Sequence, residues 1–131
     1  MKAGNIVLGI VGLVFAGFGW MLLDSGHSKS NPAAMGSASL SLAVASGQPV
    51  LLEFYADWCG PCKAVAPELE ALSKEWTGKA RVVRVNVDQQ QALAQQYAIS
   101  GIPAFVVLKK GKEVNRAVGG LPKEEIRKLV F

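Results

Sequence analysis

The chain has 131 residues, of which 50% are hydrophobic and 18% are charged, and its formal net charge is +4. This length allows one ordinary domain, or a smaller domain with an appendage. The positive charges are dispersed and form no basic stripe, which argues against a nucleic-acid partner.

Residues 3–23 form an apolar run with no ionisable side chain. As a helix the run would reach about 30 Å at ~1.5 Å per residue, the thickness of the hydrocarbon core, so residues 1–24 are predicted to be a transmembrane anchor. A cleaved signal peptide is the alternative, because Lys2 precedes the run and small residues follow it. The run is longer than a usual signal core, and no A-x-A motif follows Leu23. Lys2 favours a cytoplasmic N-terminus, which puts the rest of the chain on the periplasmic or extracytoplasmic side.

Residues 25–39 are rich in Ser, Gly, Ala and Pro and are predicted to be a flexible linker. The only histidine, His27, lies in this segment and is interpreted as a solvated linker residue rather than a catalytic or metal-binding group. Residues 40–131 are predicted to form one globular domain.

The domain alternates between helical and strand patterns. Residues 40–46 are predicted to be a short helix, although their Ser-Leu alternation also fits a strand. The rest reads as strand 50–55, helix 61–76 kinked at Pro67, strand 81–87, helix 89–97, strands 104–108 and 113–118, and helix 122–130. This order predicts an α/β fold in which a central mixed sheet is flanked by helices on both faces.

The chain's only cysteines, Cys59 and Cys62, lie in one C-x-x-C motif between a buried strand and a helix. A cysteine at a helix N-terminus faces free N–H groups and the positive end of the helix dipole, which favour the thiolate. Cys62 lies one turn further in and should be less exposed, so the pair can cycle between dithiol and disulfide. Half of a zinc site is the alternative, but a tetrahedral site needs two more ligands and only His27 remains, so no metal is expected.

The segment from Trp58 to Lys63 resembles the active-site signature of the thioredoxin family, and the resemblance covers about residues 50–130. Pro67 matches the family's helix-kinking proline, Ile102-Pro103 its cis-proline loop, and Gly119 the glycine beside that loop. The resemblance implies a thioredoxin fold and reversible dithiol/disulfide exchange with protein substrates. Cys59 would attack, Cys62 would resolve the mixed disulfide, an unidentified reductase would supply electrons, and no cofactor beyond the disulfide would be needed.

Two features depart from the family pattern. The first is Glu53, which occupies the position where the family resembled here usually has a buried aspartate. A carboxyl in an apolar strand has a raised pKa and can relay the proton that Cys62 must lose; the alternative is a glutamate at the surface end of the strand. The segment before Val50 is also shorter than usual, so the family's first strand is expected to be absent.

The remaining site predictions concern substrates. The backbone of Ile102 beside a cis Pro103 would pair with an extended target peptide, Trp58 would cover one side, and Gly119 would leave room on another. Gly60 permits the tight turn between the cysteines and Pro61 stiffens the helix start. No charge stands between the cysteines, which favours a reductase over a disulfide-forming oxidase. The leading hypothesis is a membrane-anchored protein-disulfide reductase; the alternatives are a secreted soluble thioredoxin, an oxidase, and a non-catalytic binding module.

Overall fold

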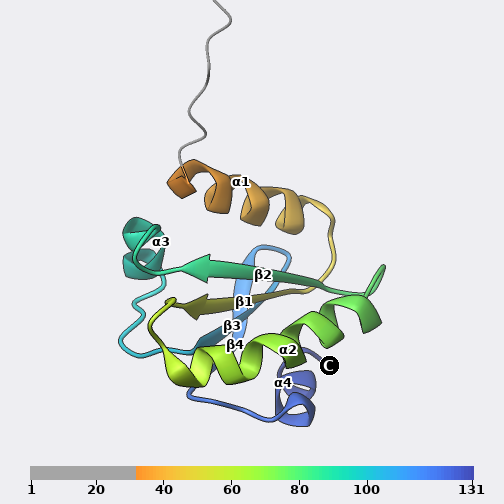
Figure 1. Ribbon diagram of the computed structural model, residues 1–131. Helices are drawn as coiled ribbons and strands as arrows, with labels where there is room; N and C mark the ends of the chain where they lie inside the picture. The colour runs from red at the N-terminus through yellow and green to blue at the C-terminus, as the bar shows by residue number, and fades with distance from the viewer. Residues whose placement is uncertain (1–31) are drawn as a thin grey trace, which may run out of the picture.

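The structure is a computed structural model that describes residues 32–131, with side chains from residue 38 onward (Figure 1). The predicted membrane segment, residues 1–24, and the linker up to residue 31 lie outside the described residues. Within the described part, no helix combines the length and apolarity needed to cross a bilayer.

The order of helices and strands is the predicted one. The elements are α1 (Pro32–Ala45), β1 (Val50–Tyr55), α2 (Gly60–Glu75), β2 (Arg81–Asn86), α3 (Gln91–Gln96), β3 (Ala104–Lys109), β4 (Lys112–Val118) and α4 (Lys123–Val130). Pro67 lies inside α2, as predicted. The alternating sequence patterns were therefore sufficient to give the order of the elements.

A four-stranded mixed sheet forms the centre, in the order β2-β1-β3-β4. β1 runs parallel to β2 and antiparallel to β3, and β3 pairs with β4 in an antiparallel hairpin. Within residues 32–131 no strand precedes β1. β2 therefore forms one edge of the described sheet.

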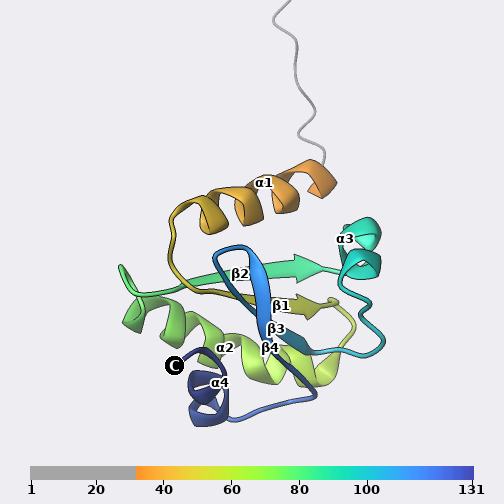
Figure 2. The same ribbon diagram turned by 180° about the vertical axis from the view of Figure 1, so that it is seen from behind.

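Helices cover both faces of the sheet, with α1 and α3 on one face and α2 and α4 on the other (Figures 1 and 2). Because neighbouring strand residues point to opposite faces, β1 supplies both cores. Leu51 packs in the cluster with α2 and α4, whereas Leu52 and Phe54 pack in the cluster on the α1 side. Glu53 lies two residues after Leu51, so its side chain points to the same face of the sheet, the α2 face, where the cysteines lie.

The first helix differs from its predicted extent. It begins at Pro32, not at Leu40, so residues 32–39 of the predicted linker are helical. Proline suits the first turn of a helix, and alanine has the strongest helix propensity. The sequence interpretation gave weight to the lack of apolar bulk in this stretch, which does not prevent a helix. The strand alternative for residues 40–46 is wrong.

Candidate active site

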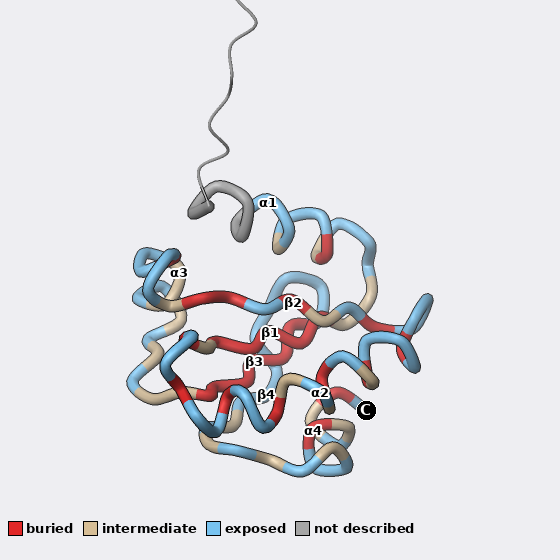
Figure 3. The backbone as a smooth tube through the Cα atoms, in the orientation of Figure 1, coloured by how far each residue is buried: buried red, intermediate tan, exposed pale blue. Residues whose placement is uncertain are grey.

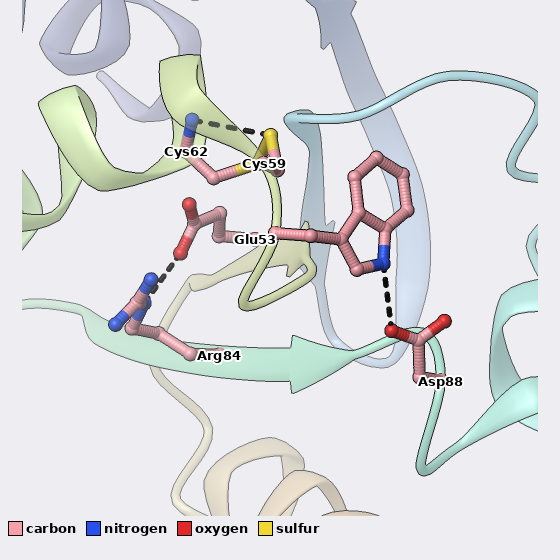
Figure 4. The surroundings of a disulfide bond; sticks show 6 residues. Glu53, Cys59, Cys62, Arg84 and Asp88 are labelled. Atoms are coloured by element: carbon pink, nitrogen blue, oxygen red, sulfur yellow. Dashed lines mark hydrogen bonds and ion pairs between the residues drawn. A yellow bond between two sulfur atoms is a disulfide. The ribbon is translucent and has the colours of Figure 1, made fainter.

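Cys59 ends the loop that follows β1 and is the N-cap residue of α2, with φ −82° and ψ 109°. Its Sγ accepts a hydrogen bond from the backbone N–H of Cys62 at 3.2 Å. The two cysteines form a disulfide with their Cα atoms 5.3 Å apart (Figure 4). When this bond is reduced, the same N–H group and the helix dipole stabilise a thiolate at Cys59.

Both cysteines are largely buried, and Cys59 is the more exposed at 5%, compared with 1% for Cys62. They cluster with Ala56, and Ile102 packs against that cluster. Cys59 is thus the more accessible of the two cysteines, which favours attack from its side.

Glu53 lies on β1 with no solvent exposure. Its Oε2 accepts a hydrogen bond from Nε of Arg84, 2.5 Å away, and Arg84 stands opposite it on β2. Its Oε1 has no hydrogen-bond partner. In Figure 4 one carboxyl oxygen is turned to Arg84, and the carboxyl lies on the side of the arginine that faces the cysteine pair. The surface-glutamate alternative is wrong, because the side chain is fully buried.

Burial raises the pKa of Glu53 above its ordinary value of 4.5, and the hydrogen bond and charge of Arg84 oppose the rise only in part. Removing a carboxylate from water disfavours its charged form, whereas a nearby cation favours it. A carboxyl whose pKa is raised by burial is better suited than an ordinary glutamate to accept and return a proton in general acid–base chemistry.

Trp58 is 70% exposed beside the cysteines. Its indole Nε1–H donates to Oδ2 of Asp88 at 2.9 Å. The turn that carries Asp88 is fixed by Asn86, whose Oδ1 accepts the backbone N–H of Asp88 at 2.9 Å. The ring is thus held in place although most of its surface faces solvent.

The Ile102-Pro103 peptide bond is cis, as predicted. The carbonyl oxygen of Pro103 accepts the backbone N–H of Gly119 at 2.8 Å, and Gly119 has a φ of +104° that side chains rarely tolerate. Gly120 lies against Pro61, since a Cβ on it would stand 3.8 Å from the Pro61 Cβ. The fold thus brings the proline loop and the end of β4 to the C-x-x-C motif, while Gly60 is exposed with open space around it.

The sequence model named Thioredoxin matches residues 33–131. The chain belongs to the thioredoxin family. It is 42% identical to a thioredoxin of Haemophilus influenzae over 90 residues, covering 69% of this chain and 84% of the relative. It is 46% identical to a thioredoxin of Bacillus subtilis over 81 residues, covering 62% of this chain and 78% of the relative.

Solved thioredoxin structures show the same fold. The thioredoxin of Fasciola hepatica superposes with a TM-score of 0.64 at 35% identity, covering 72% of this chain and 90% of that one. The thioredoxin of Nicotiana alata gives 0.65 at 32% identity, with coverage of 73% and 82%. As a thioredoxin, the chain is a thiol-disulfide oxidoreductase that works through its redox-active disulfide without a further cofactor. Thioredoxins act on disulfide substrates and accept electrons from a reductase.

The zinc alternative requires ligands beside the cysteines. Among the described residues no group of three or more His, Cys, Asp or Glu side chains could hold a metal ion. The two sulfurs are instead bonded to each other.

Sequence reasoning missed two residues that hold others in place, Arg84 and Asp88. Arg84 carried a usable signal, because a charge in the middle of a valine-rich strand needs a partner when it is partly buried. Asp88 carried none, since an aspartate after a strand is an ordinary turn residue. Its position opposite Trp58 depends on how β2 and the C-x-x-C loop meet in space.

Proposed function

We propose that this thioredoxin is a membrane-anchored protein-disulfide reductase that acts outside the cytoplasm, with Cys59 attacking and Cys62 resolving. One observation carries the redox part of the proposal. The Cys59–Cys62 disulfide lies at the N-terminus of α2, and the fully buried Glu53 lies on the same face of the sheet.

In the first step the thiolate of reduced Cys59 attacks one sulfur of a substrate disulfide. A mixed disulfide forms, and the other substrate sulfur leaves as a thiolate. The N-terminal N–H groups of α2 favour this role for Cys59, because they stabilise its thiolate.

In the second step Cys62 loses its proton and attacks Sγ of Cys59. The substrate leaves fully reduced, and the Cys59–Cys62 disulfide forms again, so two electrons have passed to the substrate. Glu53 accepts the proton of Cys62, directly or through water, because its pKa is raised by burial and its Oε1 has no other partner. A reductase then returns two electrons to the disulfide.

The substrate is an extended protein segment that crosses the cysteines between Trp58 and the cis-proline loop. Ile102 packs against the cysteine cluster, which suits backbone pairing with such a segment. The exposed Trp58 ring and the side-chain-free Gly119 border the same surface.

The direction of electron flow follows from the residues between the cysteines. Gly60 and Pro61 carry no charge that would stabilise the reduced form and make the disulfide more oxidising. We expect a reduction potential within roughly 40 mV of about −270 mV, the potential that characterises thioredoxin. A glutathione titration measures it. A value of about −150 mV or higher would support the oxidase instead.

Anchoring rests on the sequence of residues 3–23, an uncharged apolar run of spanning length. The full-length protein should fractionate with membranes and resist alkaline carbonate, and mass spectrometry should detect residues 1–24 in it. After mild reduction of intact cells, a membrane-impermeant maleimide should label Cys59. A soluble product that starts between Ser25 and Ser39 would identify a cleaved signal, and labelling only after lysis would place the domain in the cytoplasm.

Measuring turnover distinguishes the reductase from a non-catalytic binding module. The full-length protein should reduce insulin with dithiothreitol as electron source, and the rate should rise in proportion to enzyme concentration. A protein that binds insulin without reducing it would be a module of that kind.

A further inference from the structure

The outer edge of β2 has no neighbouring strand within the described residues. The backbone N–H of Arg81 donates to Pro49 and that of Val87 to Tyr55, so the odd-numbered residues of β2 face β1. Backbone groups alternate in direction along a strand, and those of Val82 and Arg84 therefore face outward. Figure 3 shows exposed positions interrupting the buried stretches of β2, whereas most of β1 is buried. An open edge of this kind can accept another strand.

A groove follows this edge between β2 and α2. Two adjoining hollows, of about 430 and 280 Å³, share the residues Ser73 and Val82. Ala66, Pro67 and Leu69 give one hollow an apolar lining, and Lys63 and Arg84 line it as well. A strand laid along β2 would place alternate side chains in this groove.

Helix α1 covers the other face of the sheet and contacts β2. Leu42 of α1 is 74% exposed. Its neighbour Ala43 is buried against the sheet, and Val44 lies beside Gly111 at the β3–β4 turn. Successive helix residues are about 100° apart, and Leu40 and Val44 both pack against the sheet, so Leu42 projects away from the sheet into solvent. The views in Figures 1 and 2 agree in placing α1 next to β2.

The charges beside the edge are mainly positive. Arg81 and Lys63 are exposed, and Arg84, whose side chain is 38% exposed, is already paired with Glu53. The acidic residue of the groove, Glu70, is paired with Lys74 at 3.1 Å. The edge therefore suits an acidic segment. A second copy of β2 fits poorly, because it would bring the same arginines together.

The opposite edge strand, β4, is less suited to strand addition. Its pairing with β3 shifts register beside Val107 and Leu108, and such irregularities increase local twist. Within the chain itself, the sequence just before α1, residues 25–31, contains no β-branched residue, Phe, Tyr or Trp. It lacks the residue types that favour strands.

We propose that the outer edge of β2, with its groove against α2, is a docking site for an extended acidic segment of a partner protein, which adds to the sheet as a further strand. Main-chain hydrogen bonds to Val82 and Arg84 hold the segment, and its acidic side chains enter the groove beside Lys63. This site is separate from the substrate surface at Trp58 and the cis-proline loop. The two sites are nevertheless connected, because Arg84 also donates a hydrogen bond to Glu53 of the redox site.

Amide hydrogen exchange measured by NMR on the full-length chain tests the proposal. The probe is an end-capped peptide of about six residues, the usual length of a strand, that alternates glutamate and valine. At saturating peptide the amides of Val82 and Arg84 should exchange at least ~10-fold more slowly, while those of Val83 and Val85, already paired with β1, should not change. The β4 amides serve as a second internal control.

Two matched comparisons make the test specific. The same peptide with lysine in place of glutamate should give no protection. Lys63→Glu should weaken binding of the glutamate peptide about ten-fold, because Lys63 lines the groove that the glutamates enter, whereas Lys112→Glu on β4 should change it by less than about two-fold. Lys112→Glu should leave insulin reduction unchanged, because Lys112 begins β4 and does not belong to the redox site.

Four results would overturn the proposal. The first is slow exchange of the Val82 and Arg84 amides in the free chain, which would mean that the chain covers its own edge. The second is protection that does not alternate along β2. The third is equal protection by the lysine peptide, and the fourth is no protection at ~1 mM glutamate peptide.

Discussion

The two ends of α2 carry different tasks. At the N-terminal end, Cys59 caps the helix and forms the disulfide with Cys62. At the C-terminal end, Glu75 accepts hydrogen bonds from Lys123 and from Arg127 of α4, and Trp76 packs edge-on against Phe131 with ring centroids 5.5 Å apart. One end presents reactive sulfur, and the other fastens the helix to the rest of the molecule.

The carboxyls associated with the two ends show the same contrast. Burial raises the pKa of Glu53, and its one arginine partner does not offset the rise. At Glu75 two cationic partners donate hydrogen bonds in an exposed setting and lower the pKa. Both glutamates have basic partners, so the burial of Glu53 away from water accounts for the opposite directions of the two pKa shifts.

The largest expected effect is at the cysteine end. Cys59→Ser should abolish insulin reduction, because no other thiol in the chain can make the first attack and leave Cys62 as the resolving group. Its midpoint of chemical unfolding should stay close to that of the reduced wild-type protein. Residual turnover above the dithiothreitol background would contradict the role of Cys59.

Trp76→Ala should be the most destabilising change at the other end. The ring is 2% exposed in the core shared by α2 and α4, and truncating such a residue costs about 3 to 5 kcal/mol of unfolding free energy. Urea unfolding measures the loss, and the activity per folded molecule should be unchanged. A loss below ~1 kcal/mol would mean that this end does not fasten the helix.

The two glutamates allow a matched comparison of activity. Glu53→Gln should slow turnover about ten-fold at about pH 6 to 7, because Cys62 loses its proton acceptor. Glu75→Gln, the same chemical change at the other end of α2, should leave turnover within about two-fold. Stopped-flow kinetics with pre-reduced protein measures both. Equal rates for the two variants would assign Glu53 to structure alone.

The smallest expected effect concerns stability and pH. The folded state holds the proton of Glu53 more tightly than the unfolded state, because the pKa of Glu53 is raised above 4.5. As pH rises above about 4.5 the unfolded chain ionises first, so the wild type should lose stability relative to Glu53→Gln, by at most ~1.4 kcal/mol per pH unit. Urea unfolding of both proteins at a series of pH values measures the difference. A wild type that gains relative stability over this range would show that Arg84 controls the carboxyl.

Much of the fold could be predicted from the sequence because local patterns determine it. Continuous apolar runs such as Val50–Tyr55 identify buried strands, and the helical spacing of Val65, Leu69 and Leu72 identifies α2. The start of α1 was misplaced, because a helix that begins in a stretch of small residues has no apolar periodicity to mark it. The cysteine pair and the cis Pro103 lie in motifs that the sequence displays directly.

The electrostatics of the site were harder to predict. The sequence places Glu53 in an apolar strand, but its pairing with Arg84 depends on the parallel register of β1 and β2. The bond between Trp58 and Asp88 likewise joins residues that only the folded sheet brings together. Contacts between distant segments set both the proton affinity of Glu53 and the position of the indole, and no local pattern encodes them.

The most direct test of the account is to trap the intermediate on the Cys62→Ser variant of the full-length protein. Reduced variant is mixed with oxidised insulin, quenched with acid and analysed by peptide mass spectrometry. The account predicts a mixed disulfide between insulin and Cys59, and none on the Cys59→Ser variant treated in the same way. If Cys59→Ser trapped insulin through Cys62 while Cys62→Ser trapped nothing, the assigned roles of the two cysteines would be reversed.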